Sequence, residues 1–247
     1  MRRRLDAELV RRGLAPSRVV AKELIDAGSV TVSGVVADKA SRQVDGGEPV
    51  LVAGPGRRFV SRGGDKLDAA LDHFDLDVAA LDCVDVGSST GGFTDCLLQR
   101  GAASVVAIDV GRHQLHESLR RDPRVVSREQ LHVRDADPVD LGGPWPLLVA
   151  DLSFISLTRV VQPLLRLCAP AADLVLLVKP QFEAERRDVA RGRGVVTDPE
   201  VWRDALARVV DAFDAAGATN MGTMVSPIHG AEGNTEFLMH LRAPDAG

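Results

Sequence analysis

A glycine-rich turn is the first segment whose residue types could do chemistry. Residues 85–94 read Asp-Val-Gly-Ser-Ser-Thr-Gly-Gly-Phe-Thr and lie between an apolar run that begins at Leu81 and a helix-like run at 93–98. A strand that turns into a helix through small residues lets a ligand approach the backbone and the free N–H groups of the helix. Since the turn contains no Gly-Lys-Ser/Thr, it predicts a nucleotide-like ligand without a triphosphate.

Charge and spacing separate the two ligands that remain, a dinucleotide and S-adenosylmethionine. Asp109 ends the next apolar run, where an acid meets the ribose hydroxyls of either ligand in Rossmann-type sites. The glycines are not spaced as Gly-x-Gly-x-x-Gly, and the carboxylate of Asp85 would repel a pyrophosphate but suits a sulfonium and an amino group. We therefore expect S-adenosylmethionine, held by Asp85, Gly87, Ser88, Ser89, Thr90, Gly91, Gly92, Phe93 and Asp109. A plain strand-to-helix turn is the alternative.

Four charged residues at the ends of apolar runs form a second candidate constellation. Asp151 follows the run 147–150, Lys179 follows 174–178, Glu236 opens the last run and Lys66 opens a helix-like run. Burying the ammonium group of Lys179 without a carboxylate partner costs several kcal/mol, so we expect Asp151 and Glu236 to serve as partners. A purely structural cluster of ion pairs is the alternative.

The elements that must position these residues alternate from Lys66 onward, which predicts an open α/β sheet with crossover helices. Strands are expected at 81–86, 104–109, 147–150, 174–178, 220–225 and 237–241, and helices at 67–74, 93–98, 157–168 and 199–216. Ligands of such sheets collect at the carboxyl ends of the strands, which is where the candidate residues fall.

The beginning of the chain is basic, although the net charge of the chain is −5. Residues 1–66 hold 13 Lys/Arg against 8 Asp/Glu, a balance of +5, whereas residues 67–247 hold 17 against 27, a balance of −10. A basic arm on an acidic body suggests a polyanionic partner. Helices at 4–12 and 17–27, strands at 30–32, 35–36 and 50–52, and exposed cations at Arg11, Arg12, Arg18 and Lys22 are expected here.

Gly54-Pro55-Gly56 marks a boundary, which predicts a small α+β domain at 1–58, a linker at 59–65 and the α/β domain at 66–247. No apolar stretch reaches the length of a membrane span, and Arg2-Arg3-Arg4 is not followed by a signal core, so a cytoplasmic chain is expected. The three widely spaced cysteines indicate neither a disulfide scaffold nor a metal site. We expect a monomer.

The first domain resembles the RNA-binding domain of the ribosomal protein S-four type. The resemblance rests on Ser17, Arg18, Leu24, Ile25, Gly28, Val30, Val32 and Gly34. It implies that a basic helical face contacts the phosphates of folded RNA, with Arg4, Arg11, Arg12, Arg18 and Lys22 as the contact residues. A solvated basic face without a partner is the alternative.

Five motifs in order resemble the TlyA family of FtsJ-like ribose methyltransferases. They are Ser61-Arg62-Gly63-Gly64-Asp65-Lys66-Leu67, Asp151 to Leu157, Val178 to Glu183, Gly194-Val195-Val196 and Ser226 to Glu236. The resemblance implies a Rossmann-like methyltransferase sheet and 2'-O-methylation of ribosomal RNA, on cytidine, with S-adenosylmethionine. It also implies that Lys66, Asp151, Lys179 and Glu236 form a catalytic tetrad.

Methyl transfer to a ribose hydroxyl needs an in-line approach and loss of the hydroxyl proton. Two roles of Lys179 compete, because a lysine has a reference pKa of about 10.4 and nearby carboxylates favour its charged form. Lys179 either takes the proton as a neutral amine or stays cationic and stabilises the developing negative charge. Asp151 and Glu236 are expected to position the lysines, and Lys66 to help hold the acceptor nucleotide.

Three other functions compete with this hypothesis. The chain could bind RNA with an inactive methyltransferase domain, act as a haemolysin, or act on a small molecule as a methyltransferase or dehydrogenase. Departures from the family pattern at Gly111-Arg112-His113-Gln114 and His132-Val133-Arg134 concern the contacts to the adenine end of the cofactor.

Overall fold

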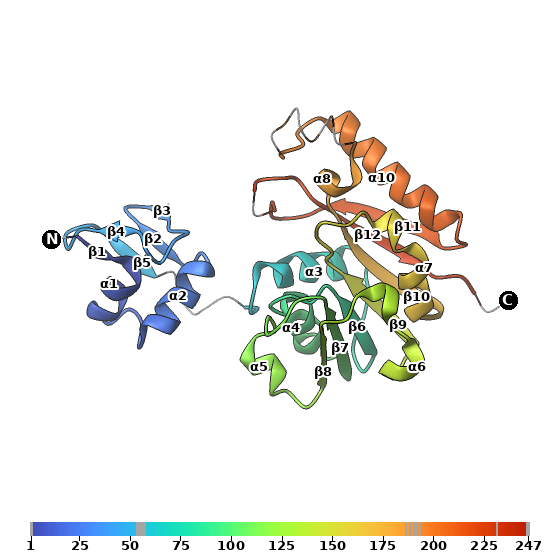
Figure 1. Cartoon of the computed structure of the whole chain (residues 1–247), viewed down its shortest axis with the longest axis horizontal. Helices are drawn as coiled ribbons and strands as arrows, with labels where there is room; N and C mark the ends of the chain where they lie inside the picture. The colour runs from blue at the N-terminus through green and yellow to red at the C-terminus, as the bar shows by residue number, and fades with distance from the viewer. Residues whose placement is uncertain are drawn as a thin grey trace. The chain divides into compact units, whose positions relative to one another are not determined.

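The chain divides into two compact units, Met1–Ser61 and Arg62–Gly247 (Figure 1). The computed structural model describes residues 2–245 except 53–57, 186, 188, 190, 191, 193 and 231. The expected boundary at Gly54-Pro55-Gly56 therefore lies outside the described residues. Residues 62–65, expected as the end of the linker, form the first turn of helix α3 (Arg62–His73) instead.

The first unit packs two helices against short strands around one apolar core. Its elements are β1 (Arg3–Arg4), α1 (Leu5–Arg11), α2 (Arg18–Asp26), β2 (Val30–Val32), β3 (Val35–Val36), β4 (Gln43–Val44) and β5 (Val50–Val52). Ser17 begins α2 as expected, because its side chain accepts a hydrogen bond from the backbone N–H of Val20. Leu5, Leu9, Ile25 and Val30 supply the centre of the core.

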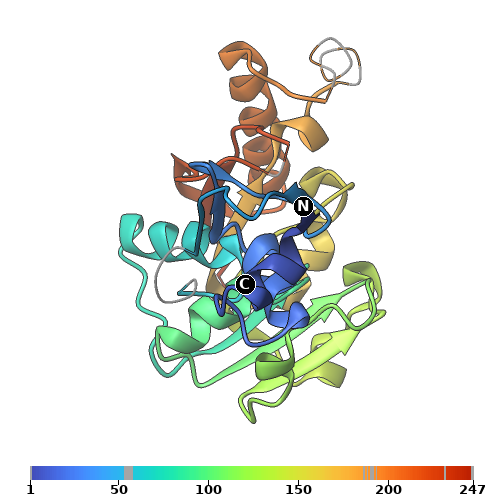
Figure 2. The ribbon, with the colours of Figure 1, turned by 90° about the vertical axis from the view of Figure 1, so that its left-hand side faces the viewer.

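The second unit is built on a seven-stranded sheet, which confirms the α/β prediction (Figures 1 and 2). In chain order its strands are β6 (Asp82–Val86), β7 (Ser104–Asp109), β8 (Val125–Glu129), β9 (Trp145–Ala150), β10 (Cys168–Val178), β11 (Thr219–Val225) and β12 (Phe237–Arg242). The order across the sheet is β11-β12-β10-β9-β6-β7-β8, and β12 runs antiparallel to both of its neighbours. The edge strand β8 was not predicted, because its side chains are half-buried or exposed and form no apolar run.

Helices cover both faces of this sheet. They are α3, α4 (Gly92–Gln99), α5 (Glu117–Arg120), α6 (Pro138–Leu141), α7 (Val161–Leu167), α8 (Pro180–Glu183) and α10 (Pro199–Asp214), with short 3-10 turns η1 (Val133–Asp135) and η2 (Leu157–Arg159). Residues of α7 and α10 share a core with Val84 and Val86 of β6. Thr94 of α4 contacts Asp85, from the opposite face. The helix expected at 157–168 is wrong in extent, since Val160 interrupts it and Cys168 already belongs to β10.

The strand register brings the candidate residues to one edge of the sheet. Val86 pairs with Ile108 on one side and with Ala150 on the other, so β6, β7 and β9 end together. Val178 pairs with Phe237, so the end of β10 lies beside the start of β12. Because the chain order reverses between β6 and β9, the crevice where such sheets bind ligands opens at this edge.

Candidate active site

The turn after β6 needs glycine at two positions. Gly87 has φ +84° and Gly91 has φ +95°, a backbone region that disfavours side chains. A Cβ atom at Gly87 would overlap the backbone carbonyl of Asp151, and one at Gly91 would overlap the side chain of Leu119. The turn therefore passes directly against the end of β9.

Asp85 is the buried acid beneath this turn. Its Oδ2 atom accepts a hydrogen bond of 2.6 Å from Thr94 Oγ1, whereas its Oδ1 atom is buried and has no hydrogen-bond partner among the described residues. Burial raises the pKa of Asp85 to about 7. An unpaired buried acceptor is costly, and a ligand with a positive charge would favour the ionised carboxylate.

Asp109 holds the turn in shape from the neighbouring strand. Its carboxylate accepts hydrogen bonds from the backbone N–H groups of Ser89, at 2.8 Å, and Gly111, at 2.6 Å. Ser89 and Thr90 are exposed beside it, whereas the side chain of Phe93 is buried at the start of α4. Phe93 is therefore part of the packing beneath the turn rather than of its exposed surface. The turn, Asp85 and Asp109 together fit a ligand with one cationic and one ribose part.

The structure pairs each lysine of the candidate tetrad with a different carboxylate. Lys179 Nζ lies 2.6 Å from Asp151 Oδ1, although the two groups lack the alignment of a hydrogen bond. Lys66 Nζ contacts Glu236 Oε2 in a short ion pair. Glu236 is 3% exposed, Lys66 8% and Lys179 9%. The expectation that both carboxylates serve Lys179 is thus corrected.

The segment after β9 carries residues to which sequence reasoning assigned no role. Lys179 Nζ donates a hydrogen bond of 2.8 Å to Ser153 Oγ. Phe154 has φ +64° and is 93% exposed, and its ring centroid lies 5.4 Å from that of Phe182. Glu183 accepts hydrogen bonds from Ser156 Oγ, at 2.6 Å, and from the backbone N–H of Leu157, at 2.8 Å. The signal that could have found them is the run of polar and aromatic residues directly after a buried strand.

A hollow of about 730 Å³ lies beside this segment. Its lining includes Phe154, Phe182, Gln181, Arg159 and Arg208. Aromatic faces stack on nucleobases and arginines contact phosphates, so the lining has the chemistry of a nucleotide site.

In the first unit, the candidate RNA-binding cations are paired with acids. Arg4 and Arg18 contact Asp6, Arg11 and Arg12 contact Glu8, and Lys22 contacts Asp26. Burial raises the pKa of Asp6, but the hydrogen bonds from its two arginines outweigh burial and lower it to about 2. Hydrogen bonds from Arg11 and Arg12 lower the pKa of Glu8 to about 2.

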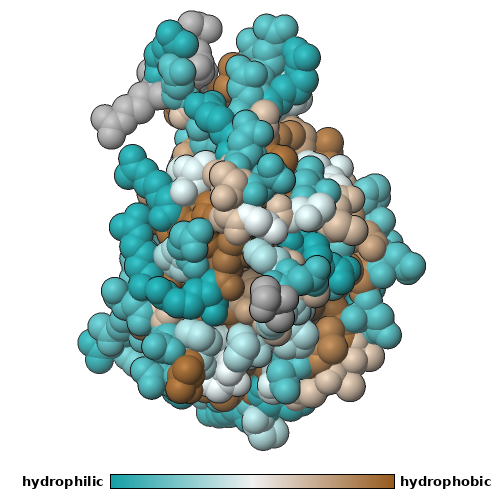
Figure 3. Space-filling view, turned by 90° about the vertical axis from the view of Figure 1, so that its right-hand side faces the viewer, coloured by the Kyte–Doolittle hydropathy of each residue, from teal (hydrophilic) through white to brown (hydrophobic). Residues whose placement is uncertain are grey.

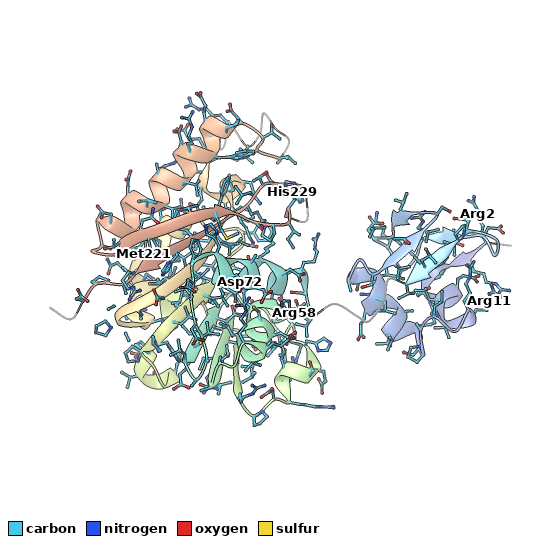
Figure 4. The ribbon with its side chains drawn as sticks, turned by 180° about the vertical axis from the view of Figure 1, so that it is seen from behind. Arg2, Arg11, Arg58, Asp72, Met221 and His229 are labelled. Carbon is cyan, nitrogen blue, oxygen red and sulfur yellow. The ribbon has the colours of Figure 1, made fainter. Side chains whose placement is uncertain are left out.

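Arg12 corrects the prediction that this group of cations is exposed. The side chain of Arg12 is 19% exposed, and its guanidinium also donates to the backbone carbonyls of Asp45, Gly46 and Glu48. The other four remain at the surface, and Figure 4 shows the outward-pointing side chain of Arg11 together with Arg2. Arg12 therefore tightens the fold of the unit, and Arg4, Arg11, Arg18 and Lys22 are available to a polyanion.

The described part of the chain gives little support to a membrane-active protein or to catalysis by a cysteine nucleophile. No helix there has both the length and the apolar character needed to cross a membrane. On the face shown in Figure 3, apolar residues form short strips between polar ones. Burial raises the pKa of the Cys83 and Cys168 thiols to about 12, so neither is a nucleophile at neutral pH.

Comparisons with known proteins cover nearly the whole chain. The profile of the FtsJ-like methyltransferase family matches residues 59–243, and that of the S4 domain matches residues 3–50. The chain is 48% identical over 242 residues to the 16S/23S rRNA (cytidine-2'-O)-methyltransferase TlyA of Mycobacterium tuberculosis, with 98% of this chain and 90% of the relative covered. It is 46% identical over 246 residues to a Bacillus subtilis protein provisionally named rRNA methyltransferase YqxC, with 99% and 87% covered.

A solved structure extends the similarity to the fold. The structure comes from Streptococcus thermophilus and is provisionally described as that of a hemolysin. It matches with a TM-score of 0.78 at 40% identity and covers 99% of this chain and 90% of that chain.

Proposed function

This chain belongs to the FtsJ-like methyltransferase family, and from that premise we propose that it transfers a methyl group from S-adenosylmethionine to the 2'-hydroxyl of a cytidine ribose in ribosomal RNA. The observation that carries the proposal is the pair of lysine–carboxylate contacts at the sheet edge that also carries the glycine turn. The name of the Mycobacterium tuberculosis relative supports the choice of ribosomal RNA and cytidine.

The cofactor would be held by residues of the turn after β6 and by the acids on either side of it. Asp85, whose Oδ1 atom is buried and unpaired beneath the turn, would favour a cationic group there, and Asp109, Ser89 and Thr90 would contact the ribose. Bound S-adenosylmethionine supplies an electrophilic methyl group. Gly87 lets the turn lie against the backbone of Asp151, directly after β9, which brings the turn next to the tetrad residue Asp151.

Lys179 would act on the ribose hydroxyl, in one of two ways. As a neutral amine it takes the hydroxyl proton, and as a cation it orients the hydroxyl and stabilises the developing charge. Asp151, at 2.6 Å, pairs with the cationic form of Lys179 at the end of β10. Glu236 holds Lys66 in the same manner, and Lys66 would contact the acceptor nucleotide.

The variant Lys179→Arg separates these two roles. Arginine keeps the positive charge but does not lose its proton in proteins. If Lys179 is the base, the methyl-transfer rate constant is expected to fall by at least about 100-fold. Single-turnover measurements check this, and full activity of the variant would exclude the base role.

The first unit would bring RNA to this site. Its surface cations Arg4, Arg11, Arg18 and Lys22 suit phosphates of folded RNA, and the S4 profile covers the same segment. Because ribosomal subunits are found in the cytoplasm, a ribosomal RNA substrate would place this protein there.

The test is methyl transfer from radiolabelled S-adenosylmethionine to purified small and large ribosomal subunits, with the modified nucleotide mapped. Label on the ribose of a cytidine is the expected result, and Lys179→Ala provides the control that retains the cofactor turn. Binding of the methyl donor without transfer to either subunit would instead favour an RNA-binding protein with an inactive methyltransferase domain.

A further inference from the structure

Resting on the proposed function, we infer that Ser153 is a positioning residue that sets the orientation of the Lys179 amine for the reaction. Ser153 lies two residues after Asp151 and is exposed at the end of β9. Its Oγ atom lies 2.8 Å from Lys179 Nζ and accepts a hydrogen bond from it.

The contacts of Lys179 Nζ with Asp151 and with Ser153 differ in how strongly they determine the orientation of the amine. Asp151 Oδ1 lies 2.6 Å from Nζ without the alignment of a hydrogen bond, and this ion pair attracts the ammonium group as a whole. The hydrogen bond to Ser153 is directional. Within the described residues it is the only hydrogen bond that Nζ donates, and it therefore determines how the amine is rotated about its Cε–Nζ bond.

The segment that carries Ser153 has a strained backbone next to Ser153 and is held at its far end by Glu183. Phe154, the next residue, has φ +64°, a conformation that costs about 1–3 kcal/mol for a residue other than glycine. Further along the same segment, Glu183 accepts hydrogen bonds from Ser156 and from the backbone N–H of Leu157. Lys179 and Glu183 thus contact both ends of residues 151–157, the segment that carries Ser153.

The orientation of the amine matters for the chemical step more than for binding. With one N–H directed at Ser153, the remaining tetrahedral positions of Nζ point in defined directions. One of these positions on Nζ must face the ribose oxygen. It carries the lone pair if Lys179 is a neutral amine and an N–H if Lys179 is a cation. Loss of the Ser153 hydroxyl leaves the ion pair in place but frees this rotation, and imperfect orientation of a reacting group lowers its rate.

Single-turnover and steady-state methylation of ribosomal subunits by the full chain test this role. Ser153→Ala is expected to lower kcat by about 10- to 100-fold while leaving KM for the subunits and Kd for S-adenosylmethionine within about twofold. Ser153→Thr, which keeps a hydroxyl at an exposed position, is expected to recover most of kcat. Ser104→Ala is the matched control, since its hydroxyl contacts Asp82 at the opposite end of β6 and β7.

The outcomes separate this role from the activity itself. If the wild-type chain transfers no methyl group, the proposed function fails and this role fails with it. If the wild type is active but Ser153→Ala keeps full kcat, or Ser153→Thr loses as much kcat as Ser153→Ala, only the positioning role is overturned. A loss shared with Ser104→Ala, or one confined to KM, also overturns it.

Discussion

At the scale of single residues, two buried lysines of the site are paired with carboxylates, whereas one buried carboxylate, Asp85, is not paired with a cation in the part of the chain that the structure describes. Lys66 and Lys179 each lie against a carboxylate, which offsets the cost of burying an ammonium group. Asp85 has no cation beside it among the described residues, and a hydroxyl and a backbone N–H of Thr94 are its hydrogen-bond partners. Burial therefore disfavours its ionised form, and a ligand that supplies a positive charge would stabilise that form. Replacing Asp85 should therefore weaken cofactor binding but stabilise the folded, ligand-free protein.

We expect Asp85→Asn to weaken S-adenosylmethionine binding by about tenfold or more, because hydrogen bonds to charged groups contribute more than neutral ones. The same change should stabilise the ligand-free protein. The pKa of Asp85 rises from an ordinary value of 3.8 to about 7 on folding, so the wild type loses stability as the pH rises between these values.

Because asparagine does not ionise, the stability advantage of the variant should be larger at pH 8 than at pH 5, by about 1–3 kcal/mol. Calorimetric titration with S-adenosylmethionine and urea unfolding at the two pH values measure both effects. Unchanged affinity would contradict the placement of the cofactor against Asp85.

At the scale of elements, two segments that follow neighbouring parallel strands hold each other. Residues 151–157 follow β9 and residues 179–183 follow β10. Lys179 contacts the beginning of the first segment, and Glu183 contacts its end. Burial raises the pKa of Glu183, while the bonds from Ser156 and Leu157 oppose the rise. A carboxylate buried in this way acts as an anchor for the segment that carries Asp151 and Ser153.

Replacing this anchor should loosen the segment. Glu183→Ala leaves the Ser156 hydroxyl and the Leu157 N–H without their acceptor, which is expected to cost about 1–3 kcal/mol in the free energy of unfolding. Faster amide hydrogen exchange at Leu157 and a lower kcat should accompany it. Glu185→Ala is the control, because its pair with Arg187 is exposed and contributes little. Equal exchange rates at Leu157 in both variants would exclude the anchoring role.

At the scale of the whole molecule, a basic first unit precedes an acidic second unit, and the proposed function assigns RNA binding to the first and methyl transfer to the second. The surface cations of the first unit are partly neutralised by Asp6, Glu8 and Asp26. In the proposed function, RNA phosphates would compete with these carboxylates, which would moderate the attraction to any polyanion. The pair of Lys22 and Asp26 is the most accessible of these contacts, with side chains 64% and 52% exposed.

Removing the competing carboxylate should strengthen RNA binding. Asp26→Asn frees Lys22 and is expected to raise the affinity for ribosomal RNA by about twofold to fivefold at low salt, with a steeper loss of affinity as salt increases. Filter binding over a salt series measures this. Glu117→Gln makes the same change in net charge at the exposed pair with Arg121 in the second unit. An equal gain in that control would show a general charge effect and contradict a specific role of Lys22.

Much of the fold was predictable because the inner strands of a parallel sheet are buried on both faces. β7, β9 and the end of β10 are nearly continuous apolar runs, which are visible without any tertiary information, whereas β6 alternates apolar residues with Asp82 and Asp85. The edge strand β8 has no such run, since only part of its surface is covered. The helix around 157–168 was misjudged for a related reason, because pairing of Cys168 with Trp145 overrides the local helical pattern.

By itself, the sequence determined the chemical inventory and the order of the elements: the glycine turn, the four charged residues and the basic first unit are contiguous patterns, and local periodicity predicts how they fold. Only the tertiary structure decided which groups meet. Lys66 and Glu236 are separated by 170 residues, and Lys179 and Ser153 by 26. Such contacts depend on strand register and on the backbone angles of single residues such as Phe154, which no local pattern specifies.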